Sequence, residues 1–220
     1  MSTNHERGAV RRLAADPLSR RRFLALTGGV GAAGALLAAC GDDDSTTATD
    51  ATTSAGMTDT ESQFGAGDLG IVNYALTLEY LEAAFYDDVA ASGLFKGAEL
   101  ATIKAIGKAE HEHVDALTAT AKQLGTPAKA PKAEFPLDDA ESVLALAATV
   151  ENLGAAAYLG QAANIEDPEI LAAALSIHSV EGRHAALLNL LSGQPPSPDG
   201  AFAKPADMQT VLDEVQPFLV

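Results

Sequence analysis

A Glu followed three residues later by a His occurs twice in this chain, and this doubled motif constrains the fold more than any other feature. The two copies are Glu110 with His113 and Glu181 with His184, each inside a long run rich in alanine and leucine. Positions i and i+3 lie on the same face of a helix. We therefore predict that each copy lies on one face of its own long helix.

The motif is half of a longer internal repeat. A lone Glu in an apolar run precedes each copy by about thirty residues, Glu79 in the first half and Glu151 in the second. A tyrosine follows each of these glutamates seven residues later, at Tyr86 and Tyr158. The repeat predicts two equivalent helical hairpins, each supplying one lone Glu and one Glu-x-x-His.

Glycines, prolines and cap residues divide the repeat into four helices. Asp68 is expected to cap the first helix, and Asp167 followed by Pro168 to start the fourth. Within each half the connection is short, whereas the middle connection is long enough to cross the bundle lengthwise. We predict an all-α four-helix bundle of two antiparallel hairpins joined by a long crossover, with a short C-terminal arm. The expected helices cover about 68–92, 98–124, 139–163 and 167–192.

Burial of the glutamates predicts the chemistry. Four unpaired carboxylates on inward faces would each carry a desolvation cost of several kcal/mol, or would take up protons. Two divalent cations would neutralise them, and carboxylates with one imidazole per metal suit iron or manganese. Glu110 and Glu181 would bridge the metals, with Glu79 and Glu151 terminal. The alternative is a proton-sharing polar core without metal. The predicted ligands are Glu79, Glu110, His113, Glu151, Glu181 and His184.

The repeat also separates these ligands from neighbouring polar residues. Glu82 has apolar neighbours like those of Glu79, but it aligns with Gly154 and so has no partner in the second half. In the same alignment His111 and Glu112 pair with Gly182 and Arg183, and His178 pairs with Gly107, so none of the three has an equivalent ligand in the other half. The residues predicted not to be ligands are Glu82, His111, Glu112 and His178, with His111 and Glu112 expected to point outward or to lie directly behind the ligands.

The N-terminus is typical of an export signal. Arg20 and Arg21 stand before an apolar run that ends in Leu-Ala-Ala-Cys at Cys40, which resembles a twin-arginine signal followed by a lipobox. An ordinary signal peptide with a chance cysteine is the alternative. Because Cys40 is the one cysteine of the chain, the domain has no thiolate ligand. We predict a twin-arginine lipoprotein signal peptide over 1–39, a lipidated Cys and disordered tether over 40–67, the bundle over 68–192 and the C-terminal arm over 193–220.

The charge of the chain bears on its partners. Residues 40–220 carry 8 basic and 28 acidic side chains, a formal charge of −20. So acidic a surface disfavours nucleic acid and anionic lipid as partners. We expect metal ions and oxygen or peroxide as small-molecule partners, the lipid anchor at Cys40 as the contact with a membrane, and copies of the same chain as a further partner to test.

The ligand pattern and its doubling resemble the ferritin-like superfamily, and most closely the bacterial ferritin-like domain proteins related to desiccation-associated proteins. The resemblance covers residues 68–192 and implies a carboxylate-bridged di-iron centre that reacts with oxygen or peroxide. It also implies that Tyr86 and Tyr158 are redox-active or lie directly behind the ligands. The chain lacks the Cys-x-x-Cys module of rubrerythrins.

These observations predict an extracytoplasmic di-iron protein, anchored to the cell membrane as a lipoprotein, with ferroxidase-like or peroxidase-like chemistry at two iron ions. Two alternatives stay open. One is a metal-binding or stress-protective envelope protein without turnover, and the other is a catalase-like activity at two manganese ions on the same ligands.

Overall fold

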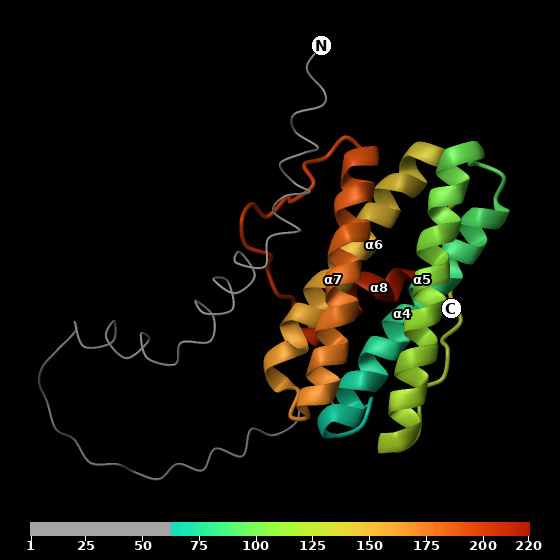
Figure 1. Cartoon of the computed structure of the whole chain (residues 1–220). Helices are drawn as coiled ribbons and strands as arrows, with labels where there is room; N and C mark the ends of the chain where they lie inside the picture. Colours follow the sequence, from blue (N-terminus) through green and yellow to red (C-terminus); the bar gives the residue numbers. More distant parts are fainter. Residues whose placement is uncertain (1–62) are drawn as a thin grey trace, which may run out of the picture. The chain divides into compact units, whose positions relative to one another are not determined.

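The computed structural model describes residues 63–220, which form four long helices and one short one (Figure 1). Arg20, Arg21 and Cys40 lie outside the described residues, as does nearly all of the predicted tether. The helices are α4 (Gly67–Ala91), α5 (Gly97–Leu124), α6 (Ala140–Gln161), α7 (Pro168–Leu191) and α8 (Met208–Val215).

The polar residues at the helix starts explain most of these boundaries. The Asp139 side chain accepts a hydrogen bond from the Ser142 N–H in a capping box, and the Asp167 side chain accepts from two N–H groups of the first turn of α7. Asp68 behaves differently from the prediction, because it lies inside the first turn of α4 and caps nothing there. Its carboxylate instead accepts from the backbone N–H groups of Glu166 and Asp167, so it ties the start of α4 to the α6–α7 connection.

The four long helices form two hairpins. Helix α4 packs along α5, α6 packs along α7, and α4 also contacts α6 (Figure 1). Residues 125–139 cross from the first hairpin to the second. The prediction of an all-α bundle of two antiparallel hairpins with a long crossover is confirmed.

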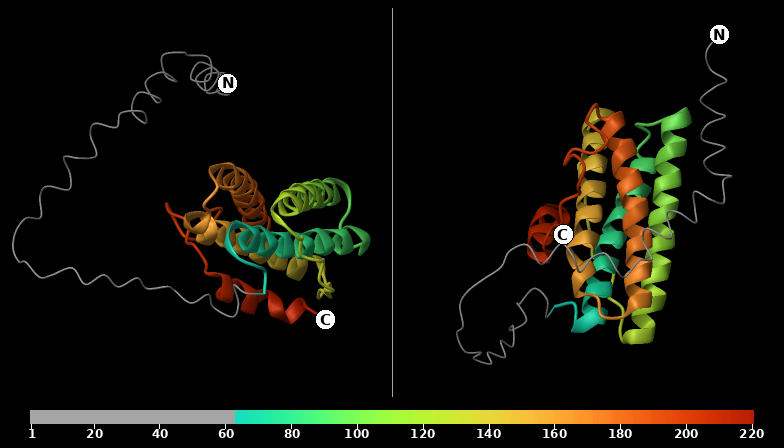
Figure 2. Two further views of the ribbon diagram at one scale, coloured as in Figure 1. Left: turned by 90° about the horizontal axis from the view of Figure 1, so that it is seen from below. Right: turned by 60° about the vertical axis from the view of Figure 1, so that its left-hand side comes forward.

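The C-terminal arm covers one side of the bundle. Helix α8 lies against α4 and α6, while α5 and α7 form the opposite side (Figure 2). Met208, Val211 and Val215 of α8 pack with a buried group on the two bundle helices, namely Tyr74, Leu78, Leu81 and Ala157. The end of the chain pairs with the crossover, since Val220 N–H donates to Lys132 O and Glu134 N–H donates to Phe218 O.

Two apolar layers enclose the middle of the bundle. One layer gathers around Phe85, Val143 and Leu188, and the other around Leu76 and Ile177. Along every long helix a buried glutamate lies between the residues that belong to the two layers. The carboxylates therefore lie at mid-height, where apolar packing above and below excludes water.

Candidate metal centre

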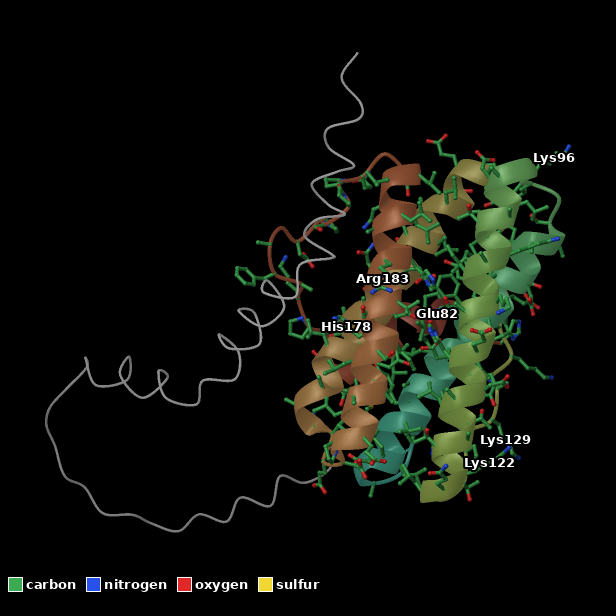
Figure 3. All side chains as sticks on the ribbon, viewed as in Figure 1. Glu82, Lys96, Lys122, Lys129, His178 and Arg183 are labelled. Atoms are coloured by element: carbon green, nitrogen blue, oxygen red, sulfur yellow. The ribbon has the colours of Figure 1, made fainter. Side chains whose placement is uncertain are left out.

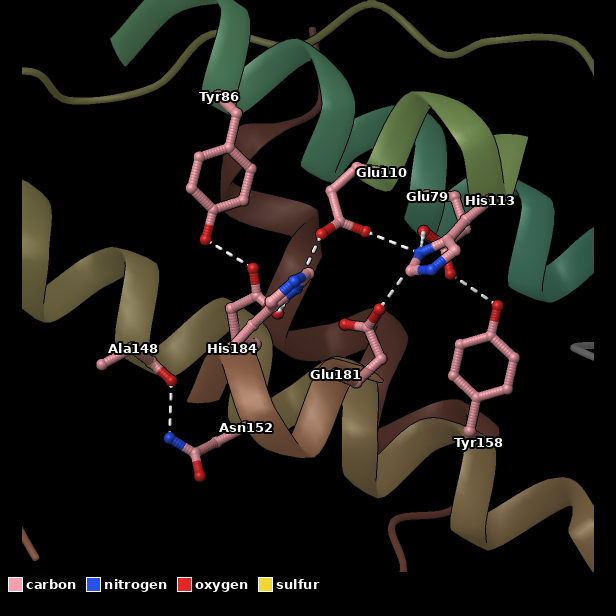
Figure 4. Close-up of polar contacts among 10 residues, drawn as sticks. Glu79, Tyr86, Glu110, His113, Ala148, Asn152, Tyr158, Glu181 and His184 are labelled. Carbon is pink, nitrogen blue, oxygen red and sulfur yellow. Dashed lines mark hydrogen bonds and ion pairs between the residues drawn. The ribbon is translucent and has the colours of Figure 1, made fainter. Parts of the chain in front are cut away.

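Each long helix contributes one fully buried carboxylate to the centre of the bundle. These glutamates have no exposed surface, and the side chains of the two histidines are only 11% and 14% exposed. All six residues point toward one another (Figure 4). The structure thus brings together every residue of the predicted ligand set, which is Glu79, Glu110, His113, Glu151, Glu181 and His184.

The polar atoms form two groups, one around each histidine. His113 Nδ1 lies 2.8 Å from Glu110 Oε2 and 3.2 Å from both Glu79 Oε2 and Glu181 Oε1. His184 Nδ1 lies 2.9 Å from Glu110 Oε1 and 3.3 Å from Glu151 Oε2. In both imidazoles the Nδ1 atom faces the carboxylates, so it is the nitrogen able to bind a metal.

Two carboxylates are common to both groups. One group consists of Glu79, Glu110, His113 and Glu181, the other of Glu110, Glu151, Glu181 and His184, and the ligand atoms within each lie no more than 4.8 Å apart. Glu110 turns one oxygen toward each histidine. Each group could hold a metal ion, and Glu110 and Glu181 would be available to both groups.

The tyrosines connect the two repeats. Tyr86 of α4 donates its hydroxyl hydrogen to Glu151 of α6 over 2.5 Å, and Tyr158 of α6 donates to Glu79 of α4 over the same distance (Figure 4). The reciprocal contacts follow the two-fold relation of the hairpins. Each of the two unshared carboxylates is therefore held in place from the other half of the repeat.

Several buried atoms of the cluster lack a hydrogen-bond partner. They are Glu110 Oε1, Glu151 Oε2, both oxygens of Glu181, and His184 Nδ1. Leaving such a group unsatisfied costs about 1–3 kcal/mol, and more when the group is charged. Since these atoms lie close together without the angles of hydrogen bonds, they suit a cation placed among them, and the donor set fits a hard or intermediate divalent metal.

The pKa values describe the cluster without a metal. Burial raises the pKa of Glu79 to about 7 and that of Glu181 well above its usual range. For Glu110 the effect of burial is outweighed by the close contacts of its carboxylate with the His113 and His184 imidazoles, which lower its pKa to about 2.

For the two histidines burial acts in the opposite direction, because it lowers the pKa of an imidazole. Burial alone would lower the pKa of His113, but its close contacts with the carboxylates of Glu110, Glu181 and Glu79 raise it to about 12. Contacts with Glu110 and Glu151 raise the pKa of His184 to about 9 in the same way. Without metal the cluster therefore favours a proton on Glu181 and positive charge on both imidazoles, and pKa values shifted this far are typical of functional sites.

Three residues that the repeat placed outside the site do lie outside it. His111 is exposed and contacts Asp87 at 3.1 Å, and the exposed Glu112 pairs with Lys108. His178 is half-buried on α7, with Nδ1 3.0 Å from the Ala155 carbonyl oxygen (Figure 3).

Glu82 belongs to neither ligand group, as the repeat predicts, but its side chain is buried. It is only 3% exposed and lies inside the bundle (Figure 3). Burial, together with the charges of Glu181 and the other cluster carboxylates, raises its pKa well above the usual range. Gly154, its equivalent in the second half, lies beside it in the bundle, because a Cβ atom on Gly154 would come within 2.7 Å of Glu82 Oε1.

Comparison with known proteins assigns the bundle to a family. A family model described as a ferritin-like domain matches residues 67–194, more than half of the chain. The matched segment begins with α4 and ends just after α7, so it contains all six residues of the cluster. No curated protein matches the chain.

Proposed function

This chain belongs to the ferritin-like domain family, and on that basis we propose that it is a di-iron carboxylate protein with ferroxidase-like activity. The observation that carries the proposal is the pair of overlapping ligand groups that share Glu110 and Glu181. Four carboxylates neutralise the charge of two Fe(II) ions, and each ion has one imidazole within its group. Glu79 and Glu151 would be the terminal ligands, one at each ion.

Two bound iron ions would supply the redox chemistry, namely the two electrons that, together with two protons, convert O₂ to H₂O₂. The six residues of the cluster would hold the ions, and the apolar layers above and below them exclude bulk water. Tyr86 and Tyr158 hold a proton against the terminal carboxylates and orient them.

The experiment is to add Fe(II) in air to metal-free protein, and to follow Fe(III) absorbance, oxygen uptake and H₂O₂ release. We expect two Fe(II) oxidised per O₂ at a stoichiometry of two irons per chain. Binding of two metals without oxidation would instead support a non-catalytic, stress-protective protein of the desiccation-associated type. Oxygen release from H₂O₂ by the manganese form, but not the iron form, would support the catalase-like alternative.

Tyr86→Phe and Tyr158→Phe are expected to retain two irons per chain but to oxidise Fe(II) about tenfold more slowly. Each change removes a hydrogen bond to a charged group, of the kind worth about 1.5–3 kcal/mol. Tyr80→Phe is the matched control, because the Tyr80 hydroxyl lies 3.5 Å from Thr118 and makes no contact with the cluster. Wild-type rates of Fe(II) oxidation in all three variants would show that Tyr86 and Tyr158 take no part in the reaction.

We also propose that the protein acts outside the cytoplasm, anchored through a lipid on Cys40 after twin-arginine export. The basic pair at Arg20 and Arg21, the apolar run and the lipobox-like ending support this placement. Export of folded protein suits a domain that must bind its metal before it leaves the cytoplasm. Cys40→Ser is expected to move the protein from the membrane fraction to the soluble fraction, and unchanged membrane association would refute the lipid anchor.

A further inference from the structure

An apolar cavity of about 30 Å³ lies inside the bundle, in the apolar layer around Leu76 and Ile177. All four long helices contribute to its lining. Of the described residues that line it, ten are alanine, valine, isoleucine or leucine, and none is charged. The cavity is larger than the roughly 10–15 Å³ that one water molecule needs, but far smaller than the about 300–1,000 Å³ of pockets that take organic ligands.

Few polar groups of the lining are free to hold a water molecule. The Tyr158 hydroxyl donates to Glu79, and the Thr120 hydroxyl donates to a backbone carbonyl of its own helix. In the described part of the chain, only the Tyr74 hydroxyl of this lining is buried without a partner. Because a buried water needs about two to four polar partners, we expect the cavity to be dry.

The cavity connects the surface of the bundle with the metal centre. At its outer end it is lined by Ala173 of α7, which is exposed. At its inner end it is lined by Tyr158, whose hydroxyl lies 2.5 Å from Glu79 Oε1 (Figure 4). Glu79 belongs to the ligand group of His113 and not to that of His184. The cavity therefore leads to one side of the metal pair, the side of His113.

The cavity lies where the two repeats differ in side-chain size. Ala174 lines it, and the equivalent residue of the first half is Ile103, which is buried in the other apolar layer. Ala157 also lines it, and its equivalent is Phe85, which has no exposed surface. The repeats place equivalent backbone positions in the two layers, and the smaller side chains leave space in the layer beside Tyr158.

We propose that this cavity binds dioxygen and delivers it to the metal pair from the side of His113. The inference rests on the proposed function and deepens it, because it selects O₂ rather than H₂O₂ as the molecule that the cavity admits. O₂ is a small apolar molecule that loses no strong hydrogen bonds when it enters a dry cavity. H₂O₂ carries two hydroxyl groups, and burial of a hydroxyl without partners is costly.

Xenon titration of the metal-free full chain, followed by the NMR shifts of its methyl groups, tests binding, since xenon enters dry apolar cavities in proteins. In the wild type we expect shifts at Leu117 and Ile170, which line the cavity. Ala174→Ile should abolish these shifts, because its side chain fills the cavity as Ile103 fills the equivalent place. Ala172→Ile is the matched control, because Ala172 is an exposed residue of the same helix that does not line the cavity.

The dependence of Fe(II) oxidation on O₂ concentration tests delivery. In Ala174→Ile we expect two irons per chain and a KM for O₂ raised by about tenfold, an effect typical of a few methyl groups in a hydrophobic pocket. Oxidation of the bound Fe(II) by added H₂O₂ should keep its wild-type rate, since H₂O₂ does not use the cavity. Ala174→Val adds less volume, so it should change the KM for O₂ less and in the same direction, and it replaces the isoleucine variant if that variant does not fold.

The outcomes separate this inference from the proposed function. No xenon-dependent shift in the wild type would overturn the cavity as a gas site, whether or not the chain oxidises iron. Loss of xenon binding in Ala174→Ile with an unchanged KM for O₂ would overturn delivery. Equal slowing with O₂ and with H₂O₂ would also overturn it, since that result would show a disturbed metal centre. Wild-type protein that binds no iron would overturn the proposed function and delivery with it, while the xenon shifts would still decide whether the cavity binds an apolar gas.

Discussion

Glu110→Ala is expected to reduce the bound metal from two ions per chain to one or none. Glu110 is the carboxylate whose two oxygens face different histidines, with Oε2 2.8 Å from His113 and Oε1 2.9 Å from His184. Its loss removes a ligand from both metal positions at once. Mutation of a residue that only hydrogen-bonds to a metal ligand typically lowers metal affinity by about 10–100-fold. The loss of Glu110, which is itself a predicted ligand, should lower the affinity further. Equilibrium dialysis with elemental analysis measures the stoichiometry directly.

Glu112→Ala is the control for this prediction. Glu112 lies two residues further along α5 but is exposed and pairs with Lys108, so its loss should leave two ions bound. Glu181→Ala should behave like Glu110→Ala, because Glu181 also belongs to both ligand groups. Two ions bound at wild-type affinity in either ligand variant would refute the shared-carboxylate arrangement.

Removal of the metal is expected to lower the thermal stability of the domain. A ligand at 100 times its Kd stabilises the native state by about 2.7 kcal/mol. For a domain of this size 1 kcal/mol corresponds to about 2–4 °C, so chelation should lower the Tm by about 5–10 °C. The physical reason is that chelation leaves a cluster of buried carboxylates and imidazoles with several unsatisfied atoms. Differential scanning calorimetry with and without chelator measures the change.

The Glu110→Ala variant makes this measurement specific. If the cluster is the site that stabilises the domain, the Tm of this variant should not respond to metal or to chelator. An equal response in wild type and variant would place the stabilising metal elsewhere. No response in either protein would favour the metal-free polar core considered from the sequence.

Local features of the fold could be predicted because they depend on residues near one another in the chain. The cap at Asp167 acts within one helical turn, and the i to i+3 spacing places Glu110 beside His113 whatever else the chain does. The internal repeat also allowed residues far apart in the chain to be related, because equivalent positions in the two hairpins lie on equivalent helix faces. All six predicted residues therefore meet in one cluster.

The contacts of Asp68 and Glu82 depended on the tertiary structure. Aspartate is a common residue at helix N-caps, but the Asp68 carboxylate accepts hydrogen bonds from the N–H groups of residues 166 and 167, nearly a hundred residues away in sequence. The pairing of each tyrosine with the glutamate of the other repeat likewise needs the two hairpins to be packed together.

The sequence by itself determined an all-α bundle with two matched Glu-x-x-His helices and two further glutamates, because helical periodicity and internal repetition both act along the chain. Only the tertiary structure decided that Glu82 lies beside the cluster. A repeat compares a residue with its equivalent, whereas the space that admits a side chain is made by a different helix. Gly154 aligns with Glu82 in the repeat and offers no equivalent carboxylate. In the packed bundle its lack of a side chain leaves space for Glu82 Oε1 and Glu181 Oε2.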